Sequence, residues 1–260
     1  MTESALVRAS VAENVLTLVL DDESTRNAFT PALRDQLMPE LDRAADDPDI
    51  RAVVLTGAGR GFCSGGNTRA MGTVTEDGKR ASMLRTGEFI ERLVTLPKPV
   101  VAAVHGYAVG AGISLALACD TVVVARGTRF IVGFTALGLI PDMGAHFFLA
   151  RALGAARAKR LLWIDGRMDA EAAHAAGLIG ELTAEDDVLT RATEVARALA
   201  QGPTLAIAAT KSILADIDLE ALRRTLRAEA ETSAQLRSSI DHGEGVAALR
   251  EKRQPRFTGR

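Results

Sequence analysis

Two glycine-rich turns are the places where the backbone of this chain could do chemistry. The first, residues 57–67 (GAGRGFCSGGN), follows the apolar run AVVLT, and the second, residues 105–112 (HGYAVGAG), follows the apolar run VVAAV. Because glycine has no Cβ, such turns let backbone N–H groups approach a ligand closely. The first turn is not a dinucleotide loop, since Phe62 stands where that fingerprint needs its third glycine. The sequence also lacks the GxxxxGKS or GxxxxGKT pattern of a phosphate-binding P-loop.

The second turn precedes an apolar stretch that reads as a helix. A helix N-terminus carries N–H donors without partners and the positive end of the helix dipole, so it favours a negative charge. If both turns aim their donors at one oxygen, they form an oxyanion hole, which stabilises an enolate or a tetrahedral anion made from a carbonyl. The alternative is that each turn only connects a strand to the next element.

Polar side chains near these turns have two possible interpretations. Asp142 follows Ile140-Pro141 and precedes a helical pattern, so it is a candidate helix cap as well as a candidate acid or base. Cys63 has no paired histidine and reads as a small buried residue rather than a nucleophile. His105 and His146 are expected to have structural roles.

Strands and helices alternate in the first half of the chain. Short β-branched runs around Ala12-Glu13-Asn14 predict a hairpin, and Thr30-Pro31 predicts the start of a helix whose leucines recur at every fourth position. The other expected elements are strands at 52–56, 100–104 and 121–125, helices at 81–95 and 112–119, and a polar loop at 68–80.

Beyond Gly138 the pattern becomes helical and rich in alanine, and strand signals nearly vanish. The expected helices are 145–153, 156–164, 170–176, 187–201, 204–215 and 219–237. We therefore expect an α/β core over residues 1–200 and a helical oligomerisation region over residues 201–260.

Composition limits the class of protein. Thirty-one Lys and Arg against 33 Asp and Glu give a net charge of −2, which argues against the strongly basic surface of a nucleic-acid binder. Two cysteines and an N-terminus without an apolar signal segment favour a reducing, cytoplasmic location. The longest apolar run, residues 100–118, contains His105 and three glycines, so a buried strand, turn and helix explain it better than a membrane span.

Four strings in register resemble the crotonase superfamily, also called enoyl-CoA hydratase/isomerase. They are GRGFCSGGN (59–67), KPVVAAVHGYAVGAGISLALACD (98–120), FIVGFTALGLIPDMG (130–144) and the C-terminal EGVAALREKRQPRFTGR. The resemblance implies an α/β crotonase fold, a spiral of ββα units with a helical C-terminal trimerisation region. It also implies an acyl-CoA thioester substrate and a homotrimer or a hexamer built as a dimer of trimers. No metal or other cofactor is expected, because coenzyme A enters as part of the substrate, and neither nucleic acid nor membrane is an expected partner.

The resemblance also assigns residues to the site. It implies that the N–H groups of Gly66 and Ala111 form the oxyanion hole. The neighbourhoods of Ala28, Ser64 and Gly65 resemble the clamp on the adenine end of coenzyme A.

The two glutamates of true hydratases are missing from the matching positions. Ser114 and Phe134 stand there instead, and we assign both to substrate binding. Hydration needs two carboxyl groups to position and activate water. The carboxyl that remains is Asp142, at a position where dienoyl-CoA isomerases, ring-epoxide isomerases of phenylacetyl-CoA breakdown and a haloaryl-CoA dehalogenase carry a working aspartate.

The resemblance therefore favours an isomerase in which Asp142 shuttles a proton while Gly66 and Ala111 hold the thioester enolate. The similarity over residues 130–144 favours the branch of the family with the phenylacetate-pathway ring isomerase and the 3,2-enoyl-CoA isomerases. We expect Phe134 to dry the pocket and to raise the pKa of Asp142. Three alternatives remain: an enoyl-CoA hydratase, a haloaryl-CoA dehalogenase, and a non-catalytic CoA-binding or assembly subunit. The dehalogenase needs a histidine from the helix before Lys98-Pro99, and residues 68–95 contain none.

Overall fold

The computed structural model describes residues 5–67 and 76–260, and within them two sheets are present. The six-stranded sheet has the order β1-β2-β3-β4-β6-β9, with β1 antiparallel to β2 and the other pairs parallel. Its strands are β1 (Val7–Ala12), β2 (Val15–Leu20), β3 (Ala52–Gly57), β4 (Val100–Val104), β6 (Thr121–Ala125) and β9 (Glu181–Thr183). The three-stranded sheet contains β5 (Tyr107–Val109), β7 (Arg129–Ile131) and β8 (Arg167–Asp169).

Local sequence explains the first elements, and the structure confirms the predicted hairpin and the helix after it. Glu13 and Asn14, both at positive φ, form the two-residue turn between β1 and β2. The side chain of Thr30 accepts a hydrogen bond from the Leu33 N–H at 3.2 Å, so the helix begins where the sequence predicts.

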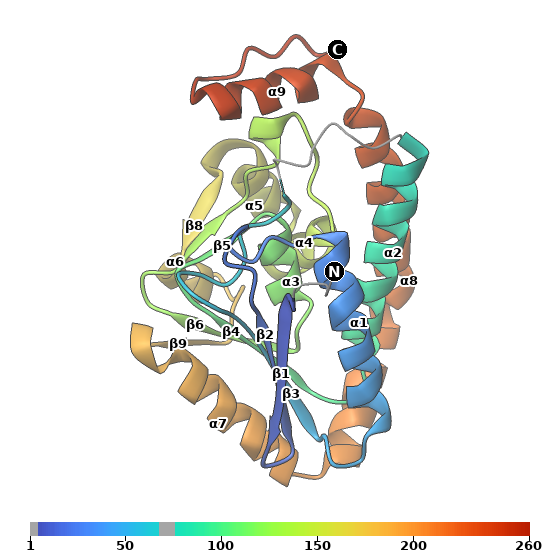
Figure 1. The fold of residues 1–260 in the computed structure, drawn as a ribbon, viewed down its shortest axis with the longest axis vertical. Coiled ribbons are helices and arrows are strands. Elements are labelled where there is room, and N and C mark those ends of the chain that lie inside the picture. Colours follow the sequence, from blue (N-terminus) through green and yellow to red (C-terminus); the bar gives the residue numbers. More distant parts are fainter. Residues whose placement is uncertain (1–4, 68–75) are drawn as a thin grey trace.

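Helices cover both faces of the large sheet (Figure 1). The described helices are α1 (Pro31–Asp46), α2 (Glu76–Thr95), α3 (Ala111–Leu117), α4 (Ala145–Leu153), α5 (Ala155–Arg160), α6 (Ala170–Ala175), α7 (Val188–Gln201), α8 (Thr204–Leu236) and α9 (Ile240–Glu251). Alternate strand residues point to opposite faces. One face packs against the alanine stripe of α7, and the other packs against α1, α2 and α3.

The chain departs from the sequence prediction mainly in its second half. The two helices expected at 204–215 and 219–237 are one 33-residue helix, α8, because neither glycine nor proline interrupts it. Helix α9 was not expected, and β8 and β9 are three-residue strands, too short to show a period of two. Helix α2 begins at Glu76, inside the predicted loop, and residues 68–75 of that loop lie outside the described residues.

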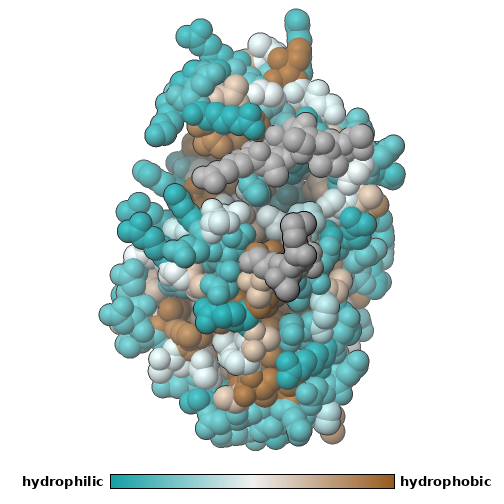
Figure 2. Space-filling view, in the orientation of Figure 1, coloured by the Kyte–Doolittle hydropathy of each residue, from teal (hydrophilic) through white to brown (hydrophobic). Residues whose placement is uncertain are grey.

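The apolar run at 100–118 is divided as the sequence predicts, into strand β4, a turn that contains the short strand β5, and helix α3. Over the part of the chain that the structure describes, no helix is both long enough and apolar enough to span a bilayer. Hydrophilic residues predominate on the face seen in Figure 2, with apolar residues in patches between them.

The first half of α8 exposes large apolar side chains. Leu205 is 87% exposed, Ile213 65%, Leu214 55% and Ile217 65%. Such a row on one helix is typical of a surface that another subunit covers. We therefore predict a closed oligomer in light scattering, which Ile213→Asp together with Ile217→Asp should dissociate. A stable monomer of the unmodified chain at micromolar concentration would contradict this prediction.

Candidate active site

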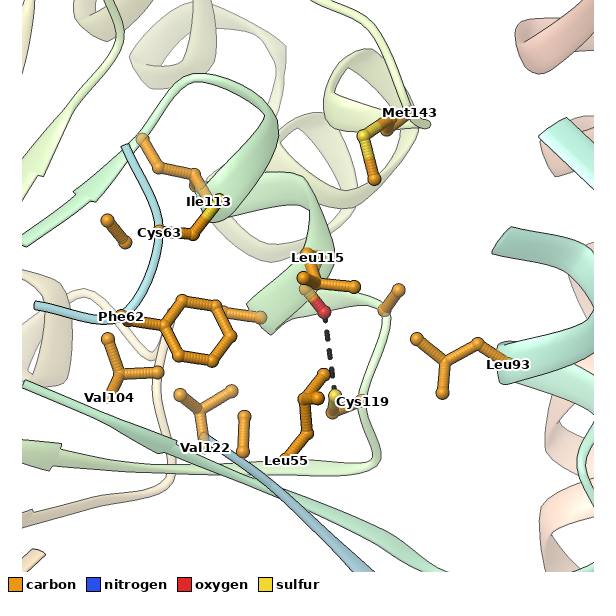
Figure 3. Packing of buried hydrophobic residues seen from close by; sticks show 14 of the residues in the cluster. Leu55, Phe62, Cys63, Leu93, Val104, Ile113, Leu115, Cys119, Val122 and Met143 are labelled. Carbon is orange, nitrogen blue, oxygen red and sulfur yellow. Dashed lines mark hydrogen bonds between the residues drawn. The ribbon is translucent and has the colours of Figure 1, made fainter. Parts of the chain in front are cut away.

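The two glycine-rich turns lie side by side. The Val109 N–H donates a hydrogen bond to the Cys63 carbonyl at 2.9 Å, and Cys63 pairs with Ala108 as an isolated parallel bridge. A Cβ on Gly112 would lie 2.8 Å from the Cβ of Cys63, so glycine is needed for this approach. Figure 3 shows Cys63 next to Ile113 in α3. The two turns are therefore adjacent in the backbone, as a shared oxyanion hole would require.

A cavity of about 770 Å³ opens beside these turns, a size typical of small-molecule sites. Its lining brings together Gly66, Ala111 and Asp142, the three residues to which the sequence analysis assigns catalysis. Ala111 is the first residue of α3, so its N–H has no partner within the helix. Glu229 of α8 and Arg237, directly after α8, line the same cavity.

Ala28, Ser64 and Gly65 form one hydrogen-bonded cluster next to the cavity. The Ala28 N–H donates to Thr25 Oγ1 at 3.1 Å, and Ser64 Oγ donates to the Thr25 carbonyl at 2.7 Å. The Gly65 carbonyl accepts from the Phe29 N–H at 2.8 Å. Thr25 and Phe29 themselves line the cavity, so this cluster shapes its wall.

Ser114 and Phe134, which the sequence analysis assigns to substrate binding, are not among the described residues that line the cavity. Ser114 is fully buried, and its Oγ donates to the main-chain carbonyl of Asp142 at 2.8 Å. The ring of Phe134 packs near Gly110, where an added Cβ would lie 3.3 Å from its Cζ. In this structure Ser114 thus holds the segment that carries Asp142, and Phe134 packs against the core.

Asp142 has the environment of an acid–base group. The residue is half-buried, but its Oδ1 is shielded from solvent and has no hydrogen-bond partner among the described residues. Burial raises the pKa of Asp142 to about 7, the negative charge of Glu229 adds to the rise, and Arg237 and His146 oppose it. A carboxyl with such a pKa can both take and return a proton near neutral pH.

The alternative interpretation of Asp142 as a helix cap is not what the structure shows. The N-cap of α4 is Gly144, with no side-chain hydrogen bond, and Asp142 contributes only its main-chain carbonyl, which accepts from the Ala145 N–H at 3.1 Å. The carboxyl group remains available to a ligand.

The raised pKa of Asp142 has a consequence for stability. Between the ordinary value of 3.8 and about 7 the folded chain binds more protons than the unfolded chain, so the free energy of unfolding falls as the pH rises through this window. The loss amounts to about 4 kcal/mol, because each pKa unit corresponds to about 1.4 kcal/mol. Asp142→Asn removes this loss, and we expect it to raise the melting temperature at about pH 8 but hardly at about pH 3, which lies below both pKa values. An equal change at both pH values in thermal unfolding would contradict this.

The two cysteines confirm the sequence interpretation. Cys63 is fully buried, and burial raises the pKa of its thiol to about 11, so it is not a nucleophile at neutral pH. Cys119 is also buried, with its Sγ 3.5 Å from the Leu115 carbonyl (Figure 3). Among residues 5–67 and 76–260, no group of three or more His, Cys, Asp or Glu side chains is arranged to hold a metal ion.

Sequence reasoning missed Glu229 and Arg237. Glu229 is only 3% exposed although it carries a carboxyl group. The sequence does contain a sign that Glu229 is unusual. Glu229 continues the row of Leu222 and Leu226 at helical spacing, and this row is buried, so an apolar residue would be normal there.

Comparison with known proteins agrees with this geometry. The family model described as enoyl-CoA hydratase/isomerase matches residues 10–260. The chain is 36% identical over 259 residues to 1,2-epoxyphenylacetyl-CoA isomerase of Escherichia coli, with 98% of each chain covered. It is 35% identical over 249 residues to 2,3-dehydroadipyl-CoA hydratase of the same organism, with 95% of this chain and 96% of that protein covered.

Solved structures give the same assignment. The crystal structure of an enoyl-CoA hydratase from Mycobacterium avium subsp. paratuberculosis superposes with a TM-score of 0.89 at 31% identity, covering 98% of this chain and all of that chain (100%). This likeness confirms the α/β crotonase fold. The chain therefore belongs to the enoyl-CoA hydratase/isomerase family of the crotonase superfamily.

Proposed function

We propose that this protein is an acyl-CoA isomerase that moves a double bond or opens a ring next to the thioester, with Asp142 as its acid–base group. One observation carries the proposal: the half-buried Asp142, whose Oδ1 has no partner among the described residues, lines the same cavity as Gly66 and Ala111. One carboxyl with a free oxygen beside two candidate oxyanion donors suits a reaction in which one proton leaves and returns.

The proposed reaction needs only residues of this chain. The N–H groups of Gly66 and Ala111 bind the thioester oxygen, which acidifies the hydrogens at C2. Ionised Asp142 takes a proton from C2 of a 3-enoyl-CoA, and the electron pair of the broken C–H bond enters the conjugated enolate. Protonated Asp142 then returns the proton at C4, and the double bond ends between C2 and C3. Atoms and charge balance without any other reactant.

A hydratase would need a second free carboxyl, and the two other carboxyls in the described lining, Asp22 and Glu229, are both engaged in hydrogen bonds. Asp22 accepts from Ser24 Oγ at 2.7 Å and from Thr25 Oγ1 at 2.6 Å. Glu229 does line the cavity, but its Oε2 accepts the Gly144 N–H at 2.8 Å and its Oε1 lies 2.7 Å from His146 Nδ1. Ser114 and Phe134 occupy the positions of the hydratase glutamates and cannot act as bases. This arrangement favours isomerisation over addition of water.

The names of relatives support both chemistries of the family. The relative called 1,2-epoxyphenylacetyl-CoA isomerase supports a ring-opening substrate, whereas the relative called 2,3-dehydroadipyl-CoA hydratase keeps hydration as the rival function. A non-catalytic CoA-binding subunit would bind acyl-CoA without turnover across a broad substrate panel.

A crystal soak with an unsaturated acyl-CoA tests the proposed function. We expect the thioester oxygen within hydrogen-bond distance of the Gly66 and Ala111 nitrogens, and the Asp142 carboxyl within reach of both C2 and C4. An ordered water held against the double bond by two carboxyl groups would overturn the isomerase assignment in favour of hydration.

A further inference from the structure

We propose that Glu229 is a positioning residue, which holds the turn that carries Asp142 and places a second negative charge against it from helix α8. The inference rests on the proposed role of Asp142 and extends it, because it makes the docking of the C-terminal helix part of the catalytic machinery.

Glu229 binds the main chain just after Asp142. Its Oε2 accepts the Gly144 N–H at 2.8 Å, and its Oε1 accepts the His146 N–H at 3.4 Å. The ring of His146 adds a contact of 2.7 Å between Nδ1 and Oε1. Three contacts from one carboxylate thus fix the residues that follow Asp142.

The turn held in this way is strained. Met143 has a φ of 56° and Gly144 a φ of 81°, so two successive residues are left-handed, and one of them is not glycine. Such a conformation persists only where its surroundings impose it, and it is found preferentially at functional sites. The carboxylate of Glu229 accepts the Gly144 N–H of this left-handed turn and so helps to hold it.

A second anchor acts from the other side. Ser114 Oγ of α3 donates to the Asp142 carbonyl at 2.8 Å. The main chain of Asp142 is therefore held between α3 and α8, while its Oδ1 has no partner among the described residues. The backbone is fixed and the carboxyl is left to the substrate.

The burial of Glu229 is difficult to explain by packing alone. The residue is 3% exposed and continues the apolar row of Leu222 and Leu226, and a buried carboxylate is stable only when its oxygens are bonded. An apolar residue would fill this position at less cost. We infer that the charge itself is used.

The charge of Glu229 acts on Asp142. Burial is the largest cause of the raised pKa of Asp142, and the like charge of Glu229 adds to it, while Arg237 after α8 and His146 on α4 lower it. Helix α2 presents Lys79 and Arg85 to the same cavity, and Asp22 lines it as well, while Ser114 of α3, outside this lining, is uncharged. Glu229 thus adds to the effect of burial and opposes these cations.

The test is the pH dependence of kcat for 3-enoyl-CoA isomerisation, whose acid limb reports the ionisation of the base. Glu229→Gln keeps the size and one acceptor oxygen but removes the charge, so the acid limb should move to lower pH by on the order of one unit. His146→Gln removes a group that lowers the pKa of Asp142, so its acid limb should move to higher pH. A purely structural role would not move the two limbs in opposite directions.

The matched control is Glu231→Gln, because Glu231 lies on the same helix, is exposed and pairs with Arg80. Its pH profile should equal that of the unmodified enzyme. If Glu229→Gln does not fold, the upward shift in His146→Gln decides alone.

The two proposals fail in different ways. Full isomerase activity in Asp142→Asn would overturn the proposed function, and this inference with it. An inactive Asp142→Asn together with an unmoved acid limb in both Glu229→Gln and His146→Gln would overturn the inference and leave the proposed function standing.

Discussion

Asp142→Asn should lower the rate of conversion of 3-enoyl-CoA to 2-enoyl-CoA roughly a hundred- to ten-thousand-fold, the usual span for a lost general base. The asparagine has nearly the same shape, but it has no basic oxygen that can take the proton from C2. We propose that the hydrogen-bonded cluster of Ala28, Ser64 and Gly65 holds coenzyme A, and because this cluster is separate from the carboxyl, binding of coenzyme A should change little.

Steady-state kinetics and calorimetric titration with acyl-CoA check this prediction together. Asp42→Asn, on the exposed side of α1 and paired with Arg92, is the matched control and should keep the full rate. Loss of acyl-CoA binding in Asp142→Asn, with the rate falling only in proportion, would mean that Asp142 binds the substrate rather than moving its proton.

Gly66→Pro should lower the same rate roughly a hundred- to a thousand-fold, because proline has no N–H and a lost oxyanion donor has an effect of this size. Gly66→Ala keeps the donor and is the matched control. Circular dichroism must first show that the proline variant has the native fold. Unchanged turnover in a folded Gly66→Pro protein would remove Gly66 from the oxyanion hole.

Ala111 provides a test of the opposite kind. Its side chain is not needed if only its N–H acts, so Ala111→Gly should turn over at close to the full rate. A slow Gly66→Pro variant together with a fully active Ala111→Gly variant would show that backbone N–H groups act at these positions, and not side chains.

Much of the fold can be predicted from local patterns in the first half of the chain. The hairpin at Glu13-Asn14, the Thr30 cap of α1 and the apolar runs of β3, β4 and β6 each carry a strong short-range signal. The sequence has no comparable signal that α8 is one continuous helix. An alanine-rich stretch favours a helix, but it does not show whether that helix is continuous or divided in two. The short strand β9 forms because β6 is available to pair with it. Such pairing depends on the tertiary fold and is not visible in the local sequence.

The candidate site shows the same division. The sequence predicts Gly66, Ala111 and Asp142 from their motifs, and the structure brings all three to one cavity. Glu229 reaches that cavity from a helix 87 positions later in the chain than Asp142, and its hydrogen bonds to the turn at Gly144 depend on how α8 docks. A buried acid on an apolar helix stripe was the available clue, but its partner was not predictable from spacing.

If one base serves this site and no water is added, two rates of the unmodified enzyme under the same conditions should differ strongly. We predict measurable isomerisation of 3-enoyl-CoA to 2-enoyl-CoA and far weaker hydration of crotonyl-CoA. Efficient hydration of crotonyl-CoA, at a rate equal to or above that of isomerisation, would contradict the proposal that Asp142 acts as the only base in an isomerase.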